Sequence, residues 1–174
     1  NVKKTYSAKD AYALKILKEN DVKCGIITND RVVSIEHAPH IFNRLDKVSL
    51  GSDKPKLEIL DAWLGEYGFT YEEVAYIGDD LPDIPVLRKV GFSACPSDAV
   101  EEAKSVSQYV CKNRGGEGAV REFVSLIIKK NKSILETETL CEHDLGRGKP
   151  NSVVGNDGKI TAVIPVRKGS TRCK

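Results

Sequence analysis

Three aspartates, Asp79, Asp80 and Asp83, crowd one glycine-led turn directly after an apolar run that is typical of a buried strand. Carboxylates this close raise one another's pKa values unless positive charge lies near, and the simplest such charge is a hard cation such as Mg²⁺. The same aspartates could instead cap a short helix, because acids in a first helical turn are stabilised by the helix dipole and Pro82 suits an early helical position. The turn alone leaves both interpretations open.

The elements that must position this turn alternate between helix and strand. Apolar periodicity and capping residues predict helices over residues 7–20, 31–37, 54–67, 82–90, 99–105 and 118–130. Strands are predicted over residues 22–28, 47–50, 74–77, 92–95 and 109–111. This alternation predicts an α/β fold, a Rossmann-like parallel sheet with helices on both faces. Such sheets bind ligands beyond the carboxyl ends of their strands, where Thr28 and Asp79 both fall.

Three side chains could therefore share one crevice. Thr28 ends one strand with a hydroxyl, Asp79 follows another with a carboxylate, and Lys54 opens a helix after a Gly-Ser-Asp turn. A hydroxyl, an ammonium and a carboxylate-bound metal together suit a phosphoryl group, because they donate hydrogen bonds to its oxygens and neutralise them. Taken singly, Thr28 also fits an ordinary strand end and Lys54 a solvated helix residue, so order and spacing carry the prediction.

The composition limits the possible functions. The chain has 174 residues, is 40% hydrophobic and 30% charged, and carries a formal net charge of +2, which favours one compact domain plus a further segment and no nucleic-acid partner. No apolar run approaches a membrane span and no signal peptide is seen, so a cytoplasmic location is expected. Five cysteines without a CxxC pair predict reduced thiols, and the absence of methionine suggests a trimmed first residue or a piece of a longer protein.

Several segments together resemble the haloacid dehalogenase (HAD) superfamily, in particular its capless 3-deoxy-manno-octulosonate-8-phosphate and nonulosonate-9-phosphate phosphatases. They are residues 26–28 (IIT), 51–54 (GSDK), 75–80 (AYIGDD) with 82–83 (PD) and 85–87 (PVL), and 114–122 (RGGEGAVRE). The resemblance covers roughly residues 1–130 as one domain. It implies hydrolysis of a phosphate monoester through an aspartyl-phosphate with Mg²⁺.

The resemblance also implies roles for single residues. Thr28 would bind the phosphoryl group, Lys54 would be the lysine of the third motif, and Asp79 would be a metal ligand. Asp80 and Asp83 would complete the acidic motif, orienting rather than ligating.

The family is typically tetrameric, and its glycine-rich tail reaches a neighbouring subunit's active site. Gly115, Gly116 and Arg121 would then help to enclose a sugar-acid phosphate across the subunit interface. Without the resemblance, a loop followed by a helix is the simpler interpretation of this tail, because glycine clusters often do no more than permit turns.

The first motif of the family is missing from the chain. It is an apolar strand ending in Asp-x-Asp-Gly that supplies the nucleophile, and it would be expected upstream of Asn1. That strand normally lies at the centre of the sheet, so its absence predicts unpaired strand edges and a marginally stable, association-prone chain. The second motif also departs from the family, because Asn29 follows Thr28 where glycine is common. The helix after it has Glu36-His37-Ala38 in place of an arginine, which leaves the sugar acid undecided.

The carboxyl-terminal part differs in composition. Residues 131–159 are polar and contain glycines, which predicts a linker. Residues 160–174 are predicted to form an apolar strand and a basic loop that resemble the start of an acylneuraminate cytidylyltransferase, with CTP as its partner. The nucleotide-binding positions implied by that resemblance are Arg167, Gly169, Ser170 and Arg172. A basic tail without a ligand is the alternative.

Two functional hypotheses follow. The first is a Mg²⁺-dependent sugar-acid phosphatase domain within a bifunctional phosphatase and cytidylyltransferase, inactive without its nucleophile motif. The second is a non-catalytic HAD-like module that assembles tetramers for an attached transferase.

Overall fold

The computed structural model describes residues 7–29, 43–144 and 161–163. Its elements, in chain order, are α1 (Ala8–Glu19), β1 (Cys24–Thr28), β2 (Lys47–Leu50), α3 (Lys56–Tyr67), the 3₁₀ turn η2 (Tyr71–Glu73), β3 (Val74–Ile77), the 3₁₀ turn η3 (Leu81–Asp83), α4 (Ile84–Leu87), β4 (Phe92–Cys95), α5 (Glu101–Val106), β5 (Tyr109–Val110), α6 (Ala119–Asp144) and β6 (Thr161–Val163). The helix predicted over residues 31–37 lies outside the described residues. The helix predicted over 82–90 is shorter, because a 3₁₀ turn precedes α4.

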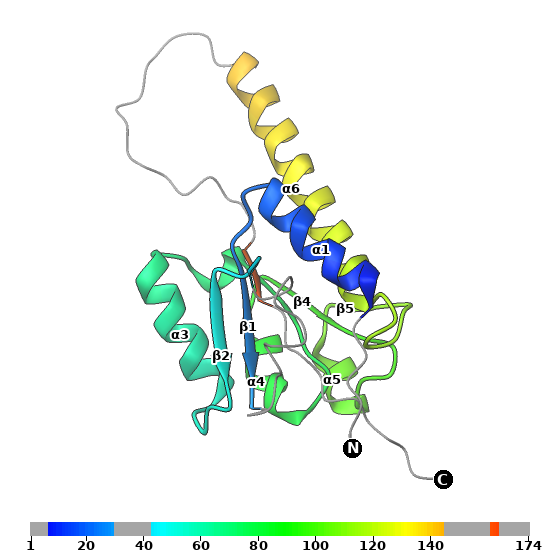
Figure 1. The fold of residues 1–174 in the computed structure, drawn as a ribbon. Helices are drawn as coiled ribbons and strands as arrows, with labels where there is room; N and C mark the ends of the chain where they lie inside the picture. The colour runs from blue at the N-terminus through cyan, green and yellow to red at the C-terminus, as the bar shows by residue number, and fades with distance from the viewer. Residues whose placement is uncertain (1–6, 30–42, 145–160, 164–174) are drawn as a thin grey trace.

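All six strands of the described structure belong to one parallel sheet, in the order β2-β1-β6-β3-β4-β5. Figure 1 shows α1 running alongside α6, and α3 beside β2. The predicted α/β fold is therefore confirmed. In a parallel sheet all strands end at the same edge, so the sheet gathers the residues that follow β1 and β3 at one place.

Apolar side chains cover both faces of this sheet. Along β3, Val74 and Tyr76 enter the core under α3, α4 and α5, whereas Ala75 and Ile77 enter the core under α1 and α6. This period of two is the normal alternation of a strand, and burial on both faces explains why β3 reads as an apolar run.

Strand β6 lies at the centre of the sheet and joins its two halves. Ala162 is in register with Cys24 of β1 on one side and with Ala75 of β3 on the other. The sequence predicts unpaired strand edges at the centre of the sheet. This prediction is wrong for the edges of β1 and β3 that pair with β6. The apolar strand expected near residue 160 is confirmed as a strand, but the structure adds it to the sheet of the first domain.

Helix α6 extends to Asp144, beyond the end at Lys130 that the sequence pattern predicts. The predicted linker, residues 131–159, is therefore helical as far as Asp144, because polarity alone does not end a helix and residues 131–145 contain no glycine or proline. In Figure 1 this part of α6 projects past the sheet. Within the described ranges, no helix has both the length and the apolar character needed to cross a membrane.

Candidate functional site

Thr28 and Asp79 lie at the same edge of the sheet, on either side of the position that β6 occupies. Thr28 is the last residue of β1 and is 5% exposed, and Asp79 follows β3 after the single residue Gly78. Because neighbouring strands are spaced by about 4.8 Å, two strands separated by a third lie about 10 Å apart. A phosphoryl group with a bound metal can fit across such a spacing. The carbonyl of Thr28 accepts a hydrogen bond from the Gly51 amide at 2.9 Å, which brings the following turn to this edge.

Two of the three aspartates in the acidic turn serve as caps. The Asp80 carboxylate accepts a hydrogen bond from the Leu81 amide at 2.8 Å, and Asp80 and Asp83 form a reciprocal capping box around η3. The helix-capping interpretation therefore holds for these two residues. Asp79 is half-buried, and its carbonyl accepts a hydrogen bond from the Val100 amide at 3.0 Å, which ties the backbone at Asp79 to the start of α5.

A buried ion pair lies beneath the turn. The Lys56 Nζ is 2.6 Å from Asp83 Oδ1, and the two side chains are 10% and 1% exposed. The hydroxyl of Tyr76 donates to the same oxygen, and the amides of Asp79 and Asp80 each donate to Asp83 Oδ2 at 3.2 Å. One carboxylate therefore links β3, α3 and the acidic turn.

Lys56 is a candidate that sequence reasoning missed, whereas Lys54 lies in the turn before α3 with an exposed side chain. The amide of Lys54 donates to Ser52 Oγ at 3.1 Å. Pro55 could have indicated that the helix begins at Lys56 and not at Lys54, because proline is common at the start of a helix. The phosphoryl-binding role of Lys54 stays a prediction.

The glycine-rich tail is held by hydrogen bonds within the chain. The Gly115 amide donates to Asp98 Oδ1 at 2.9 Å, and Gly116 adopts a φ of 76°, a conformation that favours glycine. The two glycines therefore form a defined turn ahead of α6.

Arg121 packs against α1. Its amide donates to Asp10 Oδ1 at 2.9 Å, and its guanidinium carbon lies 5.7 Å from the ring centroid of Tyr12. Its Nη1 is buried and has no hydrogen-bond acceptor in the described structure. The substrate-binding roles of Arg121, Gly115 and Gly116 stay predictions.

Glu122 anchors the strand-to-loop segment that leads to this tail, and it sets a pH dependence. Burial raises the pKa of Glu122, but hydrogen bonds from the Lys112 amide, the Tyr109 hydroxyl and Asn113 outweigh this effect and lower the pKa below 4.5. A lowered carboxylate pKa stabilises the fold above pH 4.5, and this stabilisation is lost as the pH falls through the pKa of the folded state.

We expect Glu122→Gln to lower the free energy of unfolding at pH 7 by about 1–2 kcal/mol, because an amide cannot accept all of these hydrogen bonds. Urea unfolding at decreasing pH should show the gap between variant and wild type closing below pH 4.5. Glu117→Gln, at a neighbouring exposed position, is the matched control and should show no such gap. A gap that stays constant with pH would contradict this role of the carboxylate.

The described residues supply part of a metal site. Asp79 offers a carboxylate oxygen, the ligand type that Mg²⁺ prefers, and it stands at the predicted edge. However, no group of three or more His, Cys, Asp or Glu side chains that could hold a metal ion occurs within residues 7–29, 43–144 and 161–163. These residues fit a metal through one ligand and do not complete its coordination.

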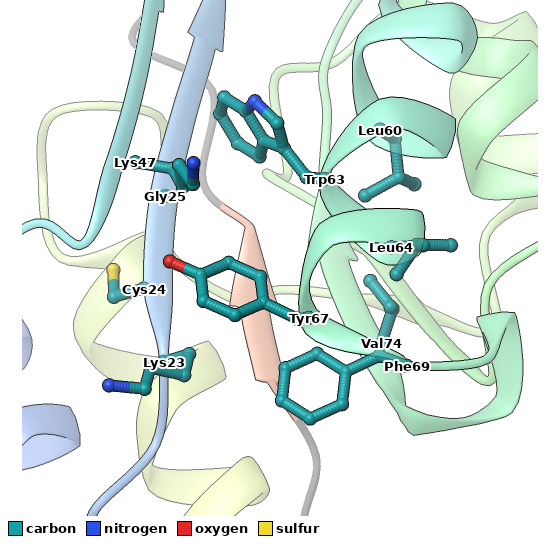
Figure 2. A pocket seen from close by; sticks show the side chains of 10 residues that line it. All are labelled: Lys23, Cys24, Gly25, Lys47, Leu60, Trp63, Leu64, Tyr67, Phe69 and Val74. Atoms are coloured by element: carbon teal, nitrogen blue, oxygen red, sulfur yellow. The ribbon is translucent and has the colours of Figure 1, made fainter.

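An apolar pocket lies away from this edge, near the amino ends of β1 and β3. Figure 2 shows Trp63 and Tyr67 of α3 directed toward β1, with Phe69 beside them. A Cβ added at Gly25 would meet Trp63 Cζ3 at 2.6 Å, so glycine is needed for this close approach. The pocket has aromatic walls and is remote from Thr28, which makes it part of the packing of α3 on the sheet.

Cysteine chemistry at the site is not supported by the described thiols. Cys24, Cys95 and Cys111 are buried and form no disulfide, as predicted. Burial raises the pKa values of Cys24 and Cys111 to about 12, so these thiols stay protonated near neutral pH. The cytidylyltransferase-like positions Arg167, Gly169, Ser170 and Arg172 lie outside the described residues, and their role stays a prediction.

Comparison with known proteins agrees with this geometry. Residues 9–91 match the haloacid dehalogenase-like hydrolase family. The 3-deoxy-D-manno-octulosonate 8-phosphate phosphatase of Yersinia pestis is 34% identical over 125 residues, which are 72% of this chain and 66% of that protein. A structure of the phosphatase of the same name from Moraxella catarrhalis was solved in complex with a magnesium ion, a phosphate ion and a KDO molecule. It matches with a TM-score of 0.67 at 32% identity, and the match covers 73% of this chain and 72% of that one. The chain belongs to the haloacid dehalogenase-like hydrolases.

A further relative of this haloacid dehalogenase-like hydrolase is the N-acylneuraminate cytidylyltransferase A of Danio rerio. It is 32% identical over 136 residues, which are 76% of this chain and 31% of that protein. The chain therefore spans two thirds or less of the two curated relatives named here. The predicted relationship to the phosphatases is confirmed, and a cytidylyltransferase matches the chain in part.

Proposed function

We propose that this chain forms the phosphoryl-binding part of a phosphatase that acts on a sugar-acid phosphate. The observation that carries the proposal is the position of Thr28 and Asp79 at one sheet edge, with the buried Lys56–Asp83 pair beneath the turn. A hydroxyl, a carboxylate and an ammonium on or next to the elements at one sheet edge suit a phosphate better than a neutral ligand.

Each residue has a proposed role. The Thr28 hydroxyl donates a hydrogen bond to a phosphate oxygen, and the Lys56 ammonium supplies positive charge. Asp79 would hold Mg²⁺, which when bound neutralises phosphoryl oxygens. Asp80 and Asp83 hold the turn in place through their capping interactions.

The relatives support a proposed substrate class. We favour 3-deoxy-manno-octulosonate 8-phosphate or a nonulosonate 9-phosphate, because relatives are phosphatases of the first compound and a cytidylyltransferase of an acylneuraminate. We also propose that the domain belongs to a bifunctional protein whose downstream domain uses CTP. The protein would form a cytoplasmic homotetramer, in which Gly115, Gly116 and Arg121 reach the active site of a neighbouring subunit.

A second candidate, a non-catalytic tetramer-forming module, is favoured by one specific observation. The strand at the centre of the sheet is β6, and residues 161–174 contain no aspartate or glutamate. An aspartyl-phosphate would therefore need a carboxylate from another segment, and such a segment would have to share or replace the position of β6.

Phosphate release by the full-length protein separates the two candidates. With Mg²⁺ and either sugar-acid phosphate, we expect release that falls about 100-fold or more in Asp79→Asn, because a metal ligand is lost. Thr28→Val should lower release about tenfold to a hundredfold, because it removes a hydrogen bond to a charged group. Asp61→Asn, an exposed carboxylate on α3, is the matched control and should change little. A well-folded protein that forms tetramers but releases no phosphate would support the non-catalytic module and overturn the phosphatase.

A further inference from the structure

The Asp83 carboxylate is surrounded by donors from separate elements. Its Oδ1 accepts from the Lys56 ammonium at 2.6 Å and from the Tyr76 hydroxyl, and its Oδ2 accepts from the amides of Asp79 and Asp80. Asp83 itself is 0% exposed. A buried carboxylate is tolerated when it is paired and its lone pairs accept hydrogen bonds, and this one meets both conditions.

Tyr76 is an unusual residue in this arrangement. It is 0% exposed and lies in the middle of β3, where an aliphatic residue or phenylalanine would serve packing alone. Burial, and then the charge and hydrogen bond of Asp83, raise the pKa of Tyr76 well above 10.0, so its hydroxyl keeps the proton that it donates. The hydroxyl is therefore a permanent donor to Asp83.

The space around this contact is tightly filled. A Cβ added at Gly78 would lie 2.5 Å from Asp83 Cβ and 2.9 Å from Tyr76 Cε1. Real Cβ atoms essentially never approach so closely, so these two side chains pack against Gly78 in space that the Cβ of any other residue would occupy. Tyr76 and Asp83 thus pack closely against the backbone that leads into the acidic turn.

We infer that Tyr76 is a positioning residue, whose hydroxyl holds Asp83 so that this carboxylate fixes both the Lys56 ammonium and the Asp79–Asp80 backbone at the phosphoryl site. This inference rests on the proposed function. An ammonium carries three donors, and Asp83 engages one of them, so the orientation of Asp83 decides where the other two point. Tyr76 touches neither phosphate nor metal and acts only through Asp83.

The test compares Tyr76→Phe with Tyr71→Phe in the full-length protein. Tyr71 is the matched control, because its hydroxyl also donates to an aspartate, Asp61, but at the surface of η2 and α3. Amide hydrogen exchange at Asp79 and Asp80 should be roughly tenfold or more faster in Tyr76→Phe, as expected for the loss of one hydrogen bond to a charged group that holds them. Tyr71→Phe should leave both rates unchanged, and the Ile77 amide serves as an internal reference for general loosening of β3.

Calorimetric affinity for inorganic phosphate in the presence of Mg²⁺ gives the second readout. We expect it to fall about fivefold or more in Tyr76→Phe and to stay the same in Tyr71→Phe. In an Asp83→Asn background, adding Tyr76→Phe should change exchange and affinity less than about twofold, because the tyrosine acts through that carboxylate.

Three results would overturn the inference. They are exchange rates at Asp79 and Asp80 that stay within about twofold of wild type in Tyr76→Phe, faster exchange with unchanged phosphate affinity, and full additivity with Asp83→Asn. A wild-type protein that binds no phosphate would refute the proposed function instead, and amide exchange would still decide whether Tyr76 holds the turn. If Asp83→Asn does not fold, the comparison of Tyr76→Phe with Tyr71→Phe is sufficient.

Discussion

Lys56→Met is expected to lower the free energy of unfolding by about 3–5 kcal/mol, because it leaves the Asp83 carboxylate buried without its cation. Methionine has a similar length and fills much the same space, so the loss comes mainly from the missing charge. Chemical denaturation at neutral pH measures this change. In a variant that still folds, phosphate affinity should also fall, because the same ammonium is proposed to bind the phosphoryl group.

Lys54→Met is the matched control, two residues earlier in the chain. Its side chain is exposed, so its free energy of unfolding should stay within about 0.5 kcal/mol of wild type. The pair of variants also decides which lysine binds phosphate. Unchanged phosphate affinity in Lys56→Met, with a loss in Lys54→Met, would contradict the role proposed for Lys56 and support the lysine expected from the sequence.

Ala162→Pro is expected to disrupt the centre of the sheet. Ala162 is in register with residues of both neighbouring strands, and proline lacks the amide that such a position needs. We expect the free energy of unfolding to fall by about 3 kcal/mol or more. Thermal unfolding followed by circular dichroism measures the effect.

Ala162→Gly keeps the amide and is the control for this variant. It should cost only about 1 kcal/mol, the usual penalty of glycine within a regular element. If Ala162→Pro unfolds at the same temperature as Ala162→Gly, β6 does not hold the two halves of the sheet together. That outcome would restore the prediction of unpaired edges on β1 and β3.

The strand ends of the site could be predicted from local patterns. Thr28 and Asp79 each come at the end of an apolar run, and parallel strands that alternate with helices must end at one edge. The capping box at Thr70 and Glu73 is likewise a local feature, because it depends on the three-residue spacing of the two side chains. These features depend on neighbours in the chain, which a sequence displays directly.

The features that were missed depend on contacts between distant segments. The pairing of β6 with β1 and β3 brings residues 161–163 beside residues 24–25 and 74–76, and no local pattern specifies such a partner. Lys56 was missed because its role depends on where α3 begins and on a partner, Asp83, in another element. In the sequence, Tyr76 is one residue of an apolar strand, and only the structure shows that its hydroxyl donates to Asp83.

A crystal structure of the full-length protein with Mg²⁺ and inorganic phosphate would show whether a phosphoryl site lies between Thr28 and Asp79. We expect phosphate at the carboxyl edge of β1 and β3, with its oxygens accepting from the Thr28 hydroxyl and the Lys56 ammonium, and Mg²⁺ bound by Asp79. Phosphate bound elsewhere, or an empty edge under conditions where calorimetry shows phosphate binding, would contradict this expectation.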